Sequence, residues 1–123
     1  MIKLYQLIPK HLTENLDSLK NTLLSKYPGL QLSIHKIMGK DELYLSKIIV
    51  PSDGRNEGIG TKVMIELCKY ADQKKLVISL NPSDEYGGTV SKLKRFYKRF
   101  GFVENKGKYR DFEISEDMYR IPK

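Results

Sequence analysis

The segment Arg55-Asn56-Glu57-Gly58-Ile59-Gly60 carries the clearest chemical signal in the chain. Glycines at two nearby positions let the backbone come close to a ligand, because glycine has no Cβ and tolerates unusual dihedral angles. Apolar residues recur at helical spacing after Gly58, so the glycines fall where a helix begins. A helix N-terminus has backbone N–H groups without partners and the positive end of a dipole. The segment therefore predicts a phosphate site.

Two common phosphate motifs do not fit this segment. The P-loop motif needs lysine before serine or threonine, and Gly60-Thr61-Lys62 has the reverse order. The dinucleotide motif needs a third glycine, which is missing. The segment thus predicts neither an ATP site nor a NAD site. A glycine pair before a helix is also typical of a plain structural turn, and that reading stays open.

The elements on either side place this turn at the edge of a sheet. Residues 43–50 predict a strand whose end is fully apolar, which is typical of a central strand covered on both faces. A helix is predicted over residues 59–71, and the apolar run at 76–80 predicts a second strand. This order indicates a right-handed βαβ unit with parallel neighbours. The turn at 51–60 then lies at the carboxyl ends of the strands, where ligands bind in such sheets.

The N-terminal third predicts a strand, a helix and a hairpin. Residues 2–8 alternate loosely between apolar and polar side chains before a proline. Residues 12–27 carry apolar side chains at spacings of three or four, with Thr13 as a candidate N-cap. Residues 30–38 alternate and join the strand at 43–50 through a glycine turn, which predicts a β-hairpin. His35 lies on the polar face, where we expect it to face solvent.

The C-terminal third predicts a loop, a helix and short strands. Residues 81–88 are rich in turn formers, and the helix after them has an apolar stripe at positions 93, 96, 97 and 100. Gly101 ends that helix. Short strands are predicted at 102–103, 111–114 and 118–121.

Composition narrows the classes of protein. The chain has 123 residues, which suits one domain spanning residues 1–123. No apolar run approaches the ~20 residues of a membrane span, and the N-terminus has no signal-peptide pattern. Cys68 has no internal disulfide partner, so we expect a reducing, cytoplasmic location. The two histidines and the cysteine are widely scattered, and we expect no metal site.

The formal net charge of +7 is concentrated in residues 91–110. This basic segment carries eight cationic side chains against one acid, Glu104. Such a patch attracts nucleic acid, an acidic protein or the phosphates of a cofactor, and it is equally compatible with a solvated helix face. The cationic residues are Lys92, Lys94, Arg95, Lys98, Arg99, Lys106, Lys108 and Arg110.

Two motifs in order resemble the GNAT superfamily of N-acetyltransferases. The pyrophosphate loop of that superfamily reads Arg/Gln-x-x-Gly-x-Gly/Ala at a strand-to-helix junction, and residues 55–60 match it. Its next helix carries an aromatic-Tyr-x-x-x-Gly-Phe signature, which Phe96-Tyr97-Lys98-Arg99-Phe100-Gly101-Phe102 supplies. The resemblance covers about residues 40–121. It implies a GNAT-like α/β (α+β) fold: a mixed, mostly antiparallel sheet of about six strands, about three helices and a central parallel βαβ unit.

The resemblance also implies a site for acetyl-CoA. Backbone groups of Ile48 and Val50 would pair with the pantetheine arm in a gap between the parallel strands, in the manner of an added strand. Asn81 and Ser91 lie where the superfamily often contacts that arm, although valine replaces the asparagine frequent near Ser91. The side chain of Arg55 would add a positive charge beside the pyrophosphate. The backbone amides around the pyrophosphate would come from Asn56, Glu57, Gly58, Ile59, Gly60 and Thr61.

Tyr97 is implied as a general acid that protonates the departing thiolate of the coenzyme. From its spacing alone, Tyr97 is equally one member of the apolar stripe of its helix. Direct attack of an amine on a thioester needs no covalent intermediate, so we expect Cys68 to be a core residue. The general base is left open among Glu42, Asp84, Glu85, Asp111 and a water.

The leading functional hypothesis is an acetyl-CoA-dependent N-acetyltransferase that moves the acetyl group directly to an amine. The acceptor is open, and the basic segment 91–110 favours an acidic or nucleic-acid-associated one. One alternative is a basic nucleic-acid-binding module, and another is a CoA-binding protein without turnover. We expect a monomer or a homodimer.

Overall fold

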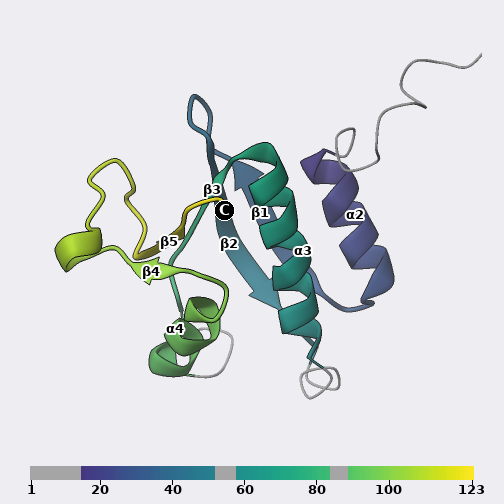
Figure 1. The fold of residues 1–123 in the computed structure, drawn as a ribbon. Helices are drawn as coiled ribbons and strands as arrows, with labels where there is room; N and C mark the ends of the chain where they lie inside the picture. Colours follow the sequence, from purple (N-terminus) through teal and green to yellow (C-terminus); the bar gives the residue numbers. More distant parts are fainter. Residues whose placement is uncertain (1–14, 52–57, 84–88) are drawn as a thin grey trace, which may run out of the picture.

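The computed structural model describes residues 15–51, 58–83 and 89–123, and it contains a five-stranded sheet (Figure 1). The strands lie in the order β1-β2-β3-β5-β4, and only β2 and β3 are parallel neighbours. This mixed, mostly antiparallel sheet confirms the expected fold class. The strands are β1 (Gln31–Lys36), β2 (Glu42–Ile49), β3 (Val77–Leu80), β4 (Val103–Glu104) and β5 (Met118–Arg120), and the helices are α2 (Leu16–Lys26), α3 (Ile59–Lys74) and α4 (Val90–Lys98).

The unit β2-α3-β3 is the predicted parallel βαβ unit. Its two strands pair from Glu42 opposite Val77 to Leu45 opposite Leu80. β3 ends there, while β2 continues to Ile49 along its other neighbour, β1. Two local features end β3: Pro82 has no N–H to donate, and the side-chain oxygen of Asn81 accepts a hydrogen bond from the Asp117 N–H at 2.7 Å. The chain therefore turns toward β5 and separates from β2.

The separation of β2 and β3 corrects one expectation. The apolar end of the strand at 43–50 was predicted to be covered on both faces, but Ile48, Ile49 and Val50 are only half-buried. Full burial is confined to the part of β2 that β3 follows, where Leu43 and Leu45 are 1% and 4% exposed. The end of β2 keeps its apolar side chains because it lines a cavity.

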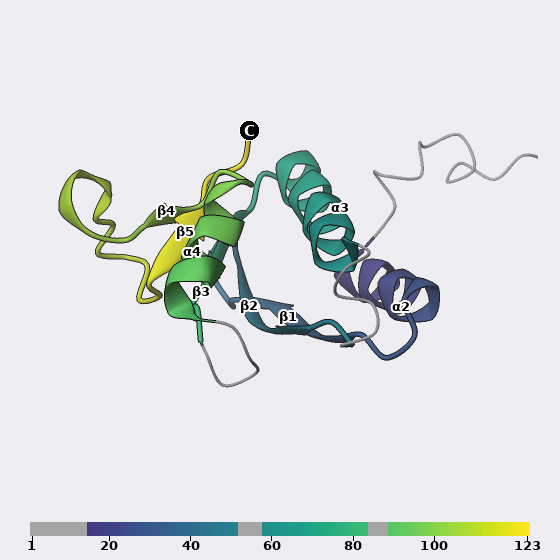
Figure 2. The same ribbon diagram turned by 90° about the horizontal axis from the view of Figure 1, so that it is seen from below.

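The core lies between the sheet and the helices. Figure 2 shows α2 and α3 on the same side of β1 and β2. Val63, Met64 and Leu67 of α3 are completely buried, and Leu23 of α2 joins the same cluster. Each such side chain contributes about 1.5–3 kcal/mol on burial. Cys68 belongs to this cluster, which confirms its predicted place in the core.

The N-terminus of α2 differs from the prediction. Asn15 is the N-cap, and its side-chain oxygen accepts a hydrogen bond from the Ser18 N–H at 2.8 Å. Asparagine is among the best residues at this position. Thr13, the expected cap, and the predicted strand at 2–8 lie outside the described residues. In the described ranges, no helix has the length and apolar character needed to cross a bilayer.

The predicted strand at 111–114 is wrong, because these residues form a turn. The buried side chain of Asn105 holds the turn: its amide donates to the carbonyl groups of Asp111, Ile114 and Glu116, and its oxygen accepts from the Asp111 N–H. These bonds satisfy backbone groups that a strand would have paired with a neighbour. A short 3-10 helix, η3 (Gly107–Tyr109), precedes the turn and was not predicted.

An ion pair ties α3 to β5 and to the end of α4. The Arg120 guanidinium donates to both carboxylate oxygens of Asp72, at 2.8 and 3.0 Å, and its Nε donates to the Phe100 carbonyl at 2.7 Å. The Lys123 N–H also donates to Asp72. The hydrogen bond from Arg120 holds the pKa of Asp72 below its ordinary value. Arg120 is 5% exposed, so its charge depends on this partner.

We expect Asp72→Asn to lower the free energy of unfolding by about 2–3 kcal/mol, because the buried Arg120 guanidinium loses its charged acceptor. Asp17→Asn is the control, since Asp17 is exposed and its pair with Lys20 is long, at 3.6 Å; it should cost less than ~1 kcal/mol. Urea denaturation measures both. The difference between wild type and Asp72→Asn should shrink as the pH falls below the ordinary carboxyl pKa, where the unfolded chain takes up the proton. Equal losses in both variants would contradict this assignment.

Candidate functional site

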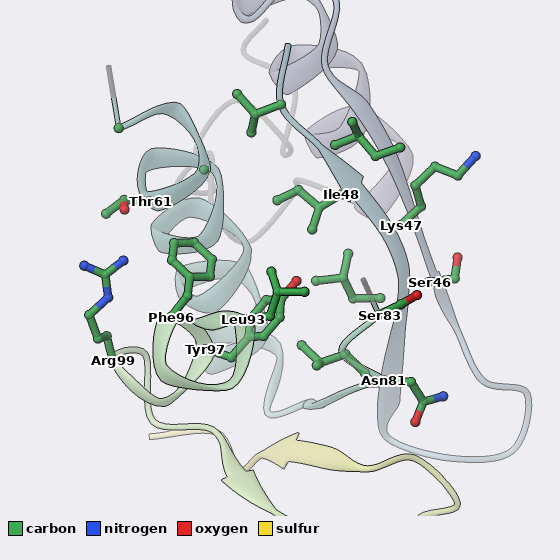
Figure 3. Close-up of a pocket in the computed structure, with 16 residues that line it drawn as sticks. Ser46, Lys47, Ile48, Thr61, Asn81, Ser83, Leu93, Phe96, Tyr97 and Arg99 are labelled. Atoms are coloured by element: carbon green, nitrogen blue, oxygen red, sulfur yellow. The ribbon is translucent and has the colours of Figure 1, made fainter. Parts of the chain in front are cut away.

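A cavity of about 440 Å³ opens where β2 and β3 separate (Figure 3). Its walls are the end of β2, the first turn of α3, the residues after β3 and one side of α4. The volume is in the range of small-molecule sites, which is about 300–1,000 Å³. No carboxylate lines it among the described residues. The cavity therefore suits a partly apolar ligand that carries no cationic group.

The first turn of α3 is built to approach a ligand. Gly58 is the N-cap with a left-handed φ of 72°, and no side chain caps the helix in the described structure. Gly60 faces the cavity between α4 and β2: a Cβ there would lie 3.6 Å from Phe96 Cζ and 3.7 Å from Val50 Cγ2. Thr61 lines the same wall. The two glycines keep the backbone of this turn open to the cavity.

Tyr97 lies on the opposite wall. It is 7% exposed, and Figure 3 shows its side chain pointing from α4 toward β2. Its ring packs against Phe96 and Phe102, with centroid distances of 5.3 and 5.7 Å. Burial raises the pKa of the Tyr97 phenol, so the group carries its proton at neutral pH. Within the described part of the chain, no group hydrogen-bonds its hydroxyl, which leaves that proton for a ligand.

The structure brings most of the predicted site residues to one cavity and leaves two outside it. Ile59 is half-buried against the core, and Ser91 is exposed on the first turn of α4. Asn81 lines the cavity, but its side chain points away from Tyr97 and holds Asp117 (Figure 3). The predicted residues that line the cavity are Ile48, Val50, Gly58, Gly60, Thr61, Asn81 and Tyr97. Arg55, Asn56 and Glu57 lie outside the described residues.

Several residues that line the cavity were not predicted from the sequence. Ser46 and Lys47 interrupt the apolar run of β2, and that interruption was the available signal. Phe96 and Arg99 lie one helical turn apart, which places them on the same side of α4. The stripe spacing did include Phe96, yet it indicated a core position and not a cavity wall. Only the tertiary structure opens a cavity beside the stripe.

The two candidate bases that the structure describes do not line this cavity. Glu42 and Asp111 line a smaller cavity of about 280 Å³, at the start of β2 and away from Tyr97. Glu42 is 5% exposed and accepts a hydrogen bond from the Ser79 hydroxyl at 2.6 Å. Burial raises the pKa of Glu42 above its ordinary value. Asp84 and Glu85 lie outside the described residues.

The histidine and the metal prediction have separate outcomes. His35 is exposed, as expected, and its ring contacts that of Tyr44 at a centroid distance of 5.5 Å. Across the described ranges, no three histidine, cysteine, aspartate or glutamate side chains gather in a way that would hold a metal ion.

Part of the basic segment is neutralised within the fold. Glu104 pairs with Lys94, Lys98 and Lys106 at 2.9, 3.1 and 3.7 Å. The hydrogen bonds from Lys94 and Lys98 lower the pKa of Glu104 to about 2. One carboxylate thus forms ion pairs with three lysines. The remaining positive charge of the segment lies on other side chains of α4 and of the residues after β4.

The comparisons with known proteins bear on the fold. No protein-family model and no curated protein matches the chain. Among solved structures, Ard1 from Thermoplasma volcanium is similar, with 19% identity and a TM-score of 0.53 over 96% of this chain and 88% of that one. Ard1 is an acetyltransferase of the GNAT family. At this identity the likeness concerns the fold alone, and it supports the expected GNAT-like architecture.

We expect Tyr97→Phe to change the free energy of unfolding by less than ~1 kcal/mol, because its hydroxyl has no partner among the described residues. Phe102→Ala provides the contrast: Phe102 is 2% exposed, and its loss should cost about 3–5 kcal/mol. Chemical denaturation measures both variants. A large loss in Tyr97→Phe would mean that the hydroxyl has a structural role.

Proposed function

We propose that this chain is an acetyl-CoA-dependent N-acetyltransferase that moves the acetyl group directly to an amine. The observation that carries the proposal is the cavity between β2 and β3, which gathers the glycine turn of α3, the end of β2 and Tyr97. The GNAT-like fold supports it, since the solved neighbour Ard1 is an acetyltransferase. We treat residues 1–123 as one domain that holds both substrates.

The walls of the cavity fit the parts of acetyl-CoA. The end of β2, with Ile48 and Val50, lines the gap as a strand edge, and a pantetheine arm would pair with it as an added strand. The start of α3 would hold the pyrophosphate, with backbone amides from residues 56–61 and charge from Arg55. Asn81 would contribute its main chain, because its side-chain oxygen already binds Asp117. Ser91 lies outside the cavity, and this arrangement does not need it.

Tyr97 would act as the general acid. Bound acetyl-CoA would supply an activated acetyl thioester in the gap that the Tyr97 side chain faces. As the amine nitrogen bonds to the acetyl carbon and the carbon–sulfur bond breaks, the phenol would pass its proton to the sulfur. Burial keeps the phenol protonated until that step. The buried Cys68 would take no part, because direct transfer needs no enzyme nucleophile.

The amine must lose a proton, and no described carboxylate of the cavity wall is placed to accept it. Glu42 and Asp111 line the other cavity. The proton would therefore pass to a water or to one of the loop acids Asp84 and Glu85, which lie outside the described residues. The basic segment 91–110 favours an acceptor with acidic neighbours, because an extended cation would be repelled there.

Wild-type protein should bind acetyl-CoA saturably in calorimetric titration. The double variant Gly58→Val, Gly60→Leu should lose at least about tenfold in affinity, because its side chains strain the turn and fill the cavity. Gly39→Val is the matched control: Gly39 also has a positive φ and open surroundings, but it lies outside the cavity. If wild type binds no acetyl-CoA, the proposal is wrong.

Turnover should depend on the Tyr97 hydroxyl. With a panel of peptide N-termini and lysine peptides as acceptors, Tyr97→Phe should lower kcat about 100-fold and leave acetyl-CoA affinity nearly unchanged. A coupled thiol-release assay measures this effect. Saturable binding without turnover on any acceptor would favour a CoA-binding protein that is not an enzyme.

A further inference from the structure

We propose that the connection between β4 and β5, together with the lysines of α4 beside it, binds single-stranded nucleic acid. Figure 1 shows this connection extending from the sheet on the side away from α2 and α3. Residues 106–114, which we call the aromatic turn, carry two exposed aromatic rings among three exposed cationic side chains. These residues do not line the large cavity, so the inference does not depend on acetyl transfer. They are Lys106, Lys108, Tyr109, Arg110 and Phe112.

The carboxylate of Glu104 joins α4 to the aromatic turn. Lys94 and Lys98 reach this carboxylate from α4, at 2.9 and 3.1 Å, and Lys106 reaches it from the turn, at 3.7 Å. Three positive charges around one carboxylate leave an excess of positive charge at this point. The side chain of Lys106 is 73% exposed, so the excess faces solvent. The cationic side of α4 and the aromatic turn therefore form one continuous surface.

The fold holds the two rings in solvent on a fixed backbone. Phe112 is 86% exposed and Tyr109 is 47% exposed. The buried amide of Asn105 donates to backbone carbonyl groups before and after Phe112, at 3.2 and 2.8 Å. The hydroxyl of the buried Tyr119 donates to the Tyr109 carbonyl. Because the turn is already formed, it loses little conformational entropy when it binds a ligand.

A cationic group lies over each of the two rings. The Arg110 guanidinium is 5.0 Å from the centroid of the Phe112 ring, and the Lys108 ammonium is 5.1 Å from that of Tyr109. Arg110 also donates to the Asn105 carbonyl at 3.2 Å, which restricts its position. Each ring on which a base would stack thus has a phosphate-binding group beside it. Aromatic platforms next to cationic side chains are the means by which proteins bind single strands without sequence preference.

The two rings favour a single strand over other polyanions. An acidic peptide would pair with the cationic side chains but would have no bases to stack on the rings. The bases of a duplex stack on one another, so a duplex also leaves the rings without partners. The acids of the turn, Asp111 and Glu113, line the smaller cavity at the start of β2, together with Lys40. The chemistry of the surface therefore fits exposed bases on a phosphate backbone.

Fluorescence anisotropy with a fluorescein-labelled oligouridylate tests the proposal. A strand of about 12 nucleotides lies within the range of ~4–16 that one small domain covers. The wild-type chain should bind it saturably, with a Kd of roughly 1–100 μM at physiological salt. The logarithm of the affinity should fall linearly with the logarithm of the salt concentration, with a slope of about −0.7 for each phosphate contact.

Variants separate stacking from charge. Phe112→Ala should weaken binding at least about fivefold and leave the salt slope unchanged, because it removes a stacking contact and no charge. Lys108→Ala should make the slope shallower by about 0.7, because one phosphate contact is lost. Met38→Ala is the matched control: Met38 is 97% exposed in the turn between β1 and β2, and its loss should change neither quantity. The urea midpoints of Phe112→Ala and Met38→Ala should equal that of wild type.

Competitors identify the kind of partner. Polyglutamate and an RNA duplex of the same length should each displace the labelled strand at least about tenfold less effectively than unlabelled oligouridylate. Equal displacement by polyglutamate would indicate a site for acidic proteins, and equal displacement by the duplex would indicate charge attraction alone. Either result would overturn the proposal, as would wild-type affinity in Phe112→Ala. Excess acetyl-CoA should leave the strand bound, and displacement by it would place the strand in the large cavity and contradict this assignment.

Discussion

Hydrogen-bonded pairing between β2 and β3 stops at Leu45 and Leu80, and the site depends on that stop. Parallel strands in full register leave no room between them for a ligand. Here β3 turns toward β5, because Pro82 lacks a donor and Asn81 binds the backbone of Asp117. β2 runs on beside β1 alone. The cavity forms where β2 no longer pairs with β3.

The core keeps this gap from closing. α3 is packed through completely buried side chains such as Val63 and Leu67, and the Asp72–Arg120 pair fixes its far end to β5. α4 is held by Tyr97 and by the aromatic contacts of its stripe. The two helices meet where Gly60 faces Phe96. The walls of the cavity are therefore parts of packed helices and strands, which is the condition for holding a ligand in one geometry.

The net charge of the molecule does not describe how its charged side chains are distributed over the fold. Glu104 forms ion pairs with three lysines of the basic segment, and these lysines keep its carboxylate ionised. Arg99, the C-cap of α4, stacks on Phe96, and no acidic side chain in the described part of the chain pairs with it. The described carboxylates that line a cavity lie at the other end of β2, and among them Glu42 has a raised pKa; they are Asp41, Glu42, Asp111 and Glu113. In the described ranges the large cavity is lined by two cationic residues, Lys47 and Arg99, and by no carboxylate, whereas the small cavity is lined by four carboxylates and Lys40.

The amino-acid sequence alone predicted the order of elements from the hairpin to α4, because hydrophobic periodicity and turn residues act over a few neighbours. It also determined the glycine turn, the place of Cys68 in the core and the aromatic stripe of Tyr97. It did not predict Asn105 as the residue that makes 111–114 a turn, nor the half-burial of Ile48. Those features depend on contacts between distant segments. The cavity shared by Arg99 and Gly60 becomes visible only in the folded chain, because it requires Phe96 of α4 to lie against the start of α3.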